Sequence, residues 1–144
     1  IDARGIELSA RAELGAFTLS GGWSLVDAEV EAGGAALGLD GLRPAQTPRH
    51  SLSTTLAWDG GGARRASLTA RYIGSQFEDD TNAVRIPDAL TFDAAAAWPL
   101  AKGIALEARA ENLTDARVVA GIGGAGVVER GTPRTLWLGL RFGR

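Results

Sequence analysis

The chain contains few of the side chains from which catalytic or metal sites are built. It has one histidine, His50, and no cysteine, which excludes thiolate chemistry and imidazole clusters and makes a serine–histidine–aspartate site difficult to assemble. One group of carboxylates, Asp79 and Asp80 beside Glu78, could contact a cation or a substrate, but a solvated turn is favoured there. We expect His50 to be a rim residue with a local hydrogen bond. The sequence therefore predicts no catalytic residues, no metal ligands, no cofactor and no enzymatic activity, and it leaves any ligand-binding residues undetermined.

One glycine-rich stretch matches a nucleotide-binding pattern. Residues 121–126 (GIGGAG) satisfy G-x-G-x-x-G, a fingerprint that needs a strand before it, a helix after it and an acidic residue about 20 positions later. Residues 127–133 (VVERGTP) do not favour a helix. We therefore expect a flexible outer loop at this position.

The overall composition narrows the class of protein further. The 144 residues include 15 Lys and Arg against 17 Asp and Glu, a net charge of −2, which argues against a nucleic-acid partner. The chain has no run of 18 apolar residues and does not start like a signal peptide. It begins at Ile1 in a strand-like stretch and lacks methionine, so we expect it to be a piece of a longer protein.

Alternation of apolar and polar residues is the main secondary-structure signal, because successive side chains of a strand point to opposite faces. Seven such runs cover about residues 6–14, 17–25, 51–58, 66–75, 90–98, 104–111 and 135–142. One face of each run carries no charge, and the other carries nearly all the charges. In residues 26–32 the alternation changes phase, which predicts either a bulge near Leu25 and Val26 or the end of the membrane-depth portion.

The connections between the runs alternate in length. Short links at 15–16, 59–63 and 99–103 alternate with long segments at about 33–50, 76–88 and 113–132. Runs of about 9–11 residues, with short turns at one end and long loops at the other, are typical of outer-membrane barrels. The sequence therefore predicts an all-β fold, an antiparallel transmembrane β-barrel. An odd number of strands does not close such a barrel, so we expect further strands upstream.

In such a barrel the charged face lines a hydrated lumen, where charges of both signs on adjacent strands could pair across the wall. The best functional candidates by position are Glu7, Arg11, Glu13, Arg71, Asp93, Glu107, Arg109, Glu111 and Arg141.

The aromatic residues test this orientation. They would face outward at two levels, where amphipathic rings prefer headgroup depth. The lower level would hold Phe17, Trp58, Trp98 and Phe142, and the upper level Tyr72 and Phe92, with Trp23 not far below it. The alternative is a soluble small β-barrel that encloses the apolar face and binds an apolar ligand there. The length of the runs and the many alanines on the apolar face weigh against that alternative.

Several short motifs, in order along the chain, resemble one known family. They are residues 4–8 (RGIEL), 21–28 (GGWSLVDA), 43–44 (RP), 47–51 (TPRHS), 72–77 (YIGSQF), 111–115 (ENLTD) and 131–134 (GTPR). Their order and spacing are similar to the late-barrel strands of TonB-dependent outer-membrane receptors. The most specific is 111–115, which resembles the Glu-Asn-Leu-Phe-Asp that the family carries near its penultimate strand.

The resemblance implies that residues 1–144 are a partial receptor β-barrel domain, about seven C-terminal strands of a larger barrel of about 22 strands, without its plug domain and N-terminal strands. It implies a Gram-negative outer-membrane location, with the lipid bilayer around the barrel and the TonB complex as a partner through the missing plug. The lumen charges could then hold the plug by breakable polar contacts. The implied activity is uptake of a scarce nutrient, an iron chelate such as a ferric siderophore or a cobalamin-like corrinoid.

Overall fold

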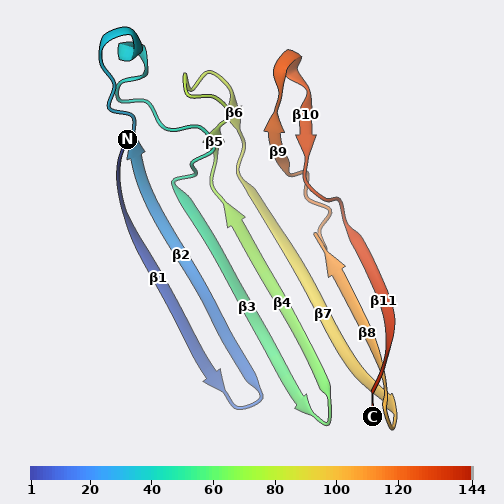
Figure 1. Cartoon of the computed structure of the whole chain (residues 1–144). Coiled ribbons are helices and arrows are strands. Elements are labelled where there is room, and N and C mark those ends of the chain that lie inside the picture. Colours follow the sequence, from blue (N-terminus) through green and yellow to red (C-terminus); the bar gives the residue numbers. More distant parts are fainter. Residues whose placement is uncertain (144) are drawn as a thin grey trace.

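The computed structural model describes residues 1–143, and these fold into a tilted antiparallel sheet (Figure 1). Within the described residues the sheet has seven strands, in the order β1-β2-β3-β4-β7-β8-β11. They are β1 (Asp2–Leu14), β2 (Phe17–Glu29), β3 (His50–Gly61), β4 (Arg64–Ile73), β7 (Ala89–Ala101), β8 (Ile104–Glu111) and β11 (Thr135–Phe142). Each strand pairs with its neighbour along the chain, so the predicted seven-stranded antiparallel sheet is confirmed.

Short turns lie at one end of the sheet and long loops at the other (Figure 1). The first loop (residues 30–49) contains a 3-10 helix, η1 (Gly34–Leu39), and the second (74–88) contains β5 (Gln76–Phe77) and β6 (Arg85–Ile86). The third loop (112–134) contains β9 (Val119–Ile122), the 3-10 turn η2 (Gly124–Gly126) and β10 (Val128–Arg130). The glycine-rich stretch therefore lies within this loop, at the tip of a small β-hairpin, and in the described residues no α-helix follows it.

The turns are tighter than the sequence indicated. Between β3 and β4 only Gly62 and Ala63 lie outside the strands, where a five-residue link was expected. Both have positive φ, 56° and 70°, as in the two-residue hairpin turns whose twist matches that of the flanking strands. Residues 59–61, which the sequence assigned to the link, therefore belong to β3.

The predicted bulge near Leu25 is wrong. The ladder between β1 and β2 runs without a shift from Asp2↔Glu29 to Leu14↔Phe17. The change of pattern arises because Asp27 and Glu29 occupy the same face as Leu25, so the exposed face turns from apolar to charged while the backbone continues unchanged. This agrees with the second interpretation, that the apolar band ends at this level.

The sheet has almost no buried apolar core. Among the described residues the buried hydrophobic side chains are Ala28, Ile86 and Ala105, whereas Leu138 is 77% exposed and Leu8 is 60% exposed. The accessible surface is 9765 Å², compared with about 7,000 Å² for a compact soluble monomer of this size. No helix within residues 1–143 is long and apolar enough to cross a bilayer. The soluble alternative requires these leucines to be enclosed, and the structure does not favour it.

The strand register places the aromatic residues of the apolar face toward its two ends. Toward the loop end, Trp23 and Tyr72 both pair with Leu52, and Phe92 pairs with Ala70. At the turn end Phe17 is opposite Trp58. Aromatic residues therefore lie toward both ends of the apolar face, as predicted.

Candidate functional site: the polar face and the outer loops

The nine predicted lumen charges share one face of the sheet. The register places them opposite mostly small or polar partners, for example Glu7 beside Ser24 and Glu13 beside Thr18. The full set on this face is Glu7, Arg11, Glu13, Arg71, Asp93, Glu107, Arg109, Glu111 and Arg141. The exposed leucines lie on the opposite face, so the sheet has one face that is apolar over most of the strand length and one face that carries these nine charges.

Several of these charges form ion pairs, as expected for a hydrated wall. Two pairs cross between strands, Arg71 with Asp93 from β4 to β7 and Arg141 with Glu107 from β11 to β8, the latter at 2.7 Å. Two others join residues of the same strand, Arg109 with Glu111 at 2.6 Å and Arg11 with Glu13 at 3.1 Å. Exposed pairs of this kind contribute little to stability, so their main effect is to keep the face polar.

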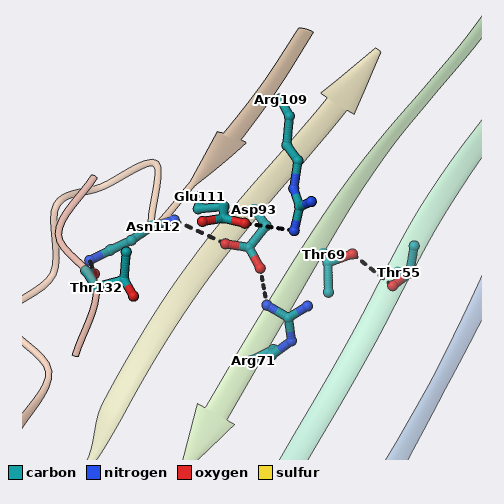
Figure 2. A network of polar contacts seen from close by, with 8 residues as sticks. All are labelled: Thr55, Thr69, Arg71, Asp93, Arg109, Glu111, Asn112 and Thr132. Carbon is teal, nitrogen blue, oxygen red and sulfur yellow. Dashed lines mark hydrogen bonds and ion pairs between the residues drawn. The ribbon is translucent and has the colours of Figure 1, made fainter. Parts of the chain in front are cut away.

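Asp93 connects the sheet to the third loop (Figure 2). One carboxylate oxygen accepts a hydrogen bond from Arg71, and the other accepts one from the backbone N–H of Asn112 at 2.9 Å. On the neighbouring strands the hydroxyls of Thr55 and Thr69 are 2.8 Å apart. Hydrogen bonds therefore connect the polar face of the sheet, through Asp93, to the start of the third loop.

Asn112 holds the two ends of the third loop together. It is only 4% exposed, and its amide donates to the carbonyls of Ala116 at 2.9 Å and Thr132 at 3.1 Å. Its side-chain oxygen accepts the N–H of Ala116 at 2.8 Å. The backbone φ is +47°, a left-handed conformation that asparagine tolerates better than most residues. The residue therefore satisfies both a conformational and a hydrogen-bonding demand.

The rest of the 111–115 motif closes the same loop. The N–H of Leu113 donates to the carbonyl of Phe92 at 2.7 Å, and the carboxylate of Asp115 accepts the N–H of Arg134 at 3.0 Å, just before β11 begins. The motif therefore ends β8, anchors the loop and directs the chain into the next strand.

The three loops are joined to one another by polar contacts. The side chain of Asn82, in the second loop, makes a double hydrogen bond with the backbone of Arg43 in the first, at 3.0 and 2.8 Å. Nearby, the N–H of Ala45 donates to Asp80 at 3.2 Å and that of Gln46 donates to the carbonyl of Phe77 at 2.7 Å. These contacts hold the first and second loops as one unit.

Glu78 extends this unit to the third loop. One of its carboxylate oxygens accepts from the side chain of Gln46 at 3.3 Å, and the other accepts the N–H of Ile122 in β9 at 3.0 Å. Beside it Ile86, in β6, is 1% exposed, and β6 lies against β9. The loop unit therefore has its own small apolar centre, more deeply buried than any side chain described in the sheet.

Asp79 organises the turn of the second loop. Its carboxylate accepts the hydroxyl of Thr81 and the backbone N–H groups of Thr81, Ala83 and Val84. The hydrogen bond from the Thr81 hydroxyl, followed by that from Val84, lowers the pKa of Asp79 to about 2. Asp79, Asp80 and Glu78 all accept donors from the loops, so these carboxylates organise the turn that the sequence predicts here.

His50 lies at the upper end of β3, as expected, but its ring packs rather than forming a local hydrogen bond. It stacks on Trp23, with centroids 6.0 Å apart and an interplanar angle of 24°. The local hydrogen bond at this residue is made by its backbone carbonyl, which accepts the N–H of Gly74 at 2.8 Å.

A hollow of about 810 Å³ lies on the polar face toward the turn end. Its floor consists of small residues, including Ala57, Ser67, Ala95 and Gly139, and Trp137 stands at one side. Among the aromatic residues of the seven strands, Trp137 is the one that shares the face of the charges, opposite Arg109.

The sequence placed Glu78 in a group of carboxylates and Asn112 in a family motif, but it predicted none of the contacts that these residues and Asn82 make. For Asn82 and Asn112 the local signal was residue type, since asparagine is frequent where the backbone is left-handed, as it is at both positions. Their partners are 20 to 44 residues away along the chain, which no local pattern reveals.

A sheet with one exposed, mainly apolar face, one charged face and long loops at a single end is the wall of a transmembrane β-barrel. Residues 1–113 match the family model described as TonB dependent receptor-like, beta-barrel. The chain therefore belongs to the TonB-dependent receptor family. A search of curated proteins found no match.

Solved receptor structures share this fold. The siderophore receptor PiuA from Acinetobacter baumannii superposes with a TM-score of 0.84 at 18% identity, over 97% of this chain and 21% of that chain. The ferric yersiniabactin uptake receptor FyuA from Yersinia pestis gives 0.80 at 19%, over 97% and 23%. The closed form of the ferric-catecholate import receptor Fiu from E. coli K12 gives 0.79 at 24%, over 97% and 20%. The chain thus spans about a fifth of the length of these receptors.

Replacing Asn112 by alanine should loosen the third loop. The change leaves the carbonyls of Ala116 and Thr132 and one N–H without partners, which costs about 1–3 kcal/mol in a buried setting. In the full-length protein we expect a lower unfolding free energy and faster amide exchange across residues 113–134. Asn112→Gly, which keeps the left-handed backbone but not the hydrogen bonds, should behave similarly, and Thr114→Ala in the same loop should not. Unchanged exchange in Asn112→Ala would contradict the anchoring role.

The second loop should become less ordered in acid. Because the pKa of Asp79 is lower in the folded protein, its contribution to stability is complete above its ordinary value of 3.8 and disappears as the pH falls through about 2. Amide exchange at residues 81–84, corrected for its intrinsic pH dependence, should therefore lose protection between these two values. Asp79→Asn should reduce protection above about pH 4, where the unmodified side chain is ionised, and should remove the transition. A transition retained in that variant would assign it to another group.

Proposed function

We propose that the chain forms part of the wall and outer mouth of an outer-membrane receptor that imports a ferric chelate with energy from TonB. The observation that carries the proposal is the separation of the two faces: one is exposed and apolar, with charges only toward its two ends, and the other is charged along the strands. Hydrocarbon stabilises the first face and water the second. Membership of the TonB-dependent receptor family supports the class of transporter.

The asymmetry of the connections supports an orientation. Outer-membrane barrels have short turns on the periplasmic side and long loops outside. The three loops would then face the medium, where a scarce nutrient is first met. Their mutual hydrogen bonds make them a single structured rim around the mouth, held through Asp93 and Asn112 to the inner wall.

The proposal includes a larger barrel. The sheet is open in the described residues, with β1 at one edge and β11 at the other, and unpaired edges are costly in hydrocarbon. The chain also spans only 20–23% of the three receptors compared above. We therefore regard residues 1–144 as a partial barrel domain, with further strands and a plug elsewhere in the protein, and the plug as the element that contacts the TonB complex.

The names of the compared receptors support a substrate class. The sequence left an iron chelate and a corrinoid open, whereas the compared receptors are named for siderophores and ferric complexes. We favour a ferric chelate. Transport requires binding and release rather than bond chemistry, so no catalytic role is assigned to any residue.

Uptake by cells that carry the full-length protein tests this function. We expect accumulation of radioactive iron from one or more ferric chelates under iron limitation, and loss of that accumulation when TonB is deleted. Uptake of labelled cobalamin alone would replace the substrate class while keeping the receptor class. Iron uptake independent of TonB would contradict the mechanism.

A matched pair of variants connects the loop unit to this activity. Glu78→Ala removes the contact between the second loop and both of its neighbours, and we expect about tenfold weaker chelate binding, which corresponds to one charge-assisted hydrogen bond. Asp88→Ala removes an exposed carboxylate from the same loop and should bind the chelate normally. Equal affinity in both variants would exclude a role for the linked rim.

A further inference from the structure

An aromatic pair with an arginine stands at the turn end of the apolar face. Trp58 on β3 and Trp98 on β7 stack across the intervening strand β4, with ring centroids 6.5 Å apart and planes inclined by 22°. The guanidinium carbon of Arg64 lies 5.2 Å from the centroid of the Trp98 ring, a cation–π distance. The three side chains therefore form one cluster on the exposed surface.

The backbone is shaped to hold this cluster. A Cβ added at Gly60 would lie 2.3 Å from the Trp58 ring, so the ring lies directly over that glycine. Ala66, the residue of β4 opposite Trp58, is small and leaves the space between the two indoles open. Larger residues at Gly60 would displace the ring, and the flat aromatic surface depends on these small neighbours.

Arg64 has no acidic partner within residues 1–143. The nearest acid along the chain, Asp59, accepts the N–H of Gly61 at 2.9 Å, and the register puts it opposite Arg65 on the polar face. Arg64 is exposed, so its remaining N–H groups are available to a ligand. The cluster is therefore a fixed cation beside a flat apolar surface.

We propose that Arg64, Trp58 and Trp98 bind the headgroup of an anionic phospholipid at the periplasmic rim of the wall. The planar guanidinium suits the two oxygens of a phosphate, and indole rings prefer the headgroup depth of a bilayer. An uncompensated cation favours lipids with net negative charge. The inference rests on the proposed membrane orientation, since only a lipid-facing surface meets such a ligand.

Lipid binding to the full-length protein in mixed micelles tests the site, with phosphatidylglycerol and phosphatidylcholine as probes in native mass spectrometry. Arg64→Gln should weaken phosphatidylglycerol binding about fivefold, the change expected for one arginine at an anionic surface. The matched control is Arg65→Gln, because the adjacent arginine lies on the polar face, and it should bind like the unmodified protein. Equal binding by both variants would overturn the site, and displacement of the lipid by millimolar inorganic phosphate would assign the cluster to free phosphate instead.

A second measurement separates failure of the site from failure of the orientation. Fluorescence quenching by lipids brominated in their acyl chains, compared between the unmodified protein and Trp98→Phe, reports whether Trp98 faces lipid whatever the headgroup. Quenching without headgroup preference overturns the lipid site and leaves the wall orientation intact. No quenching of Trp98 overturns both.

Discussion

The constraint on which the rest of the structure depends is the pairing of backbone N–H and C=O groups where no water can reach them. In hydrocarbon each unpaired group costs several kcal/mol, so a wall must be one continuous hydrogen-bonded ladder. The described sheet meets this condition, since its interstrand registers shift only beside the turns, between Asp59 and Gly61 and between Pro99 and Ala101. The face alternation follows from the ladder, which holds side chains such as Leu138, 77% exposed, on one face of the sheet.

Because the backbone groups of neighbouring strands pair with one another, the side chains of the polar face are available for other contacts. Asp93 uses this freedom, because it faces Arg71 within the wall and the base of the third loop at the same time. Glu78 makes the corresponding connection between loops. The loops are consequently joined by hydrogen bonds both to one another and to the polar face of the sheet.

The alternation of apolar and polar residues predicted the strands and their faces. It did not predict the contacts between segments that are far apart in the sequence. Seven strands, their faces and the polar set were accessible because each depends on parity within one run. The bulge at Leu25, one of two interpretations of the change of phase, was wrong because the charges of Asp27 and Glu29 begin to occupy the face of Leu25 while the backbone ladder continues. The hydrogen bonds of Asn82 and Glu78 could not be predicted, because their partners are 39 and 44 residues away and the sequence around a turn does not indicate which distant backbone group it will contact.

The separation of the two faces can be tested most directly on β7, where Ala95 and Ala96 are adjacent, exposed and on opposite faces near the middle of the strand. The measurement is the unfolding free energy of the full-length protein in lipid vesicles with arginine at each position. At Ala96 arginine should cost about 2–4 kcal/mol, and at Ala95 it should cost less than about 1 kcal/mol because water remains beside it. Equal costs at the two positions would contradict the assignment of one face to lipid and the other to water.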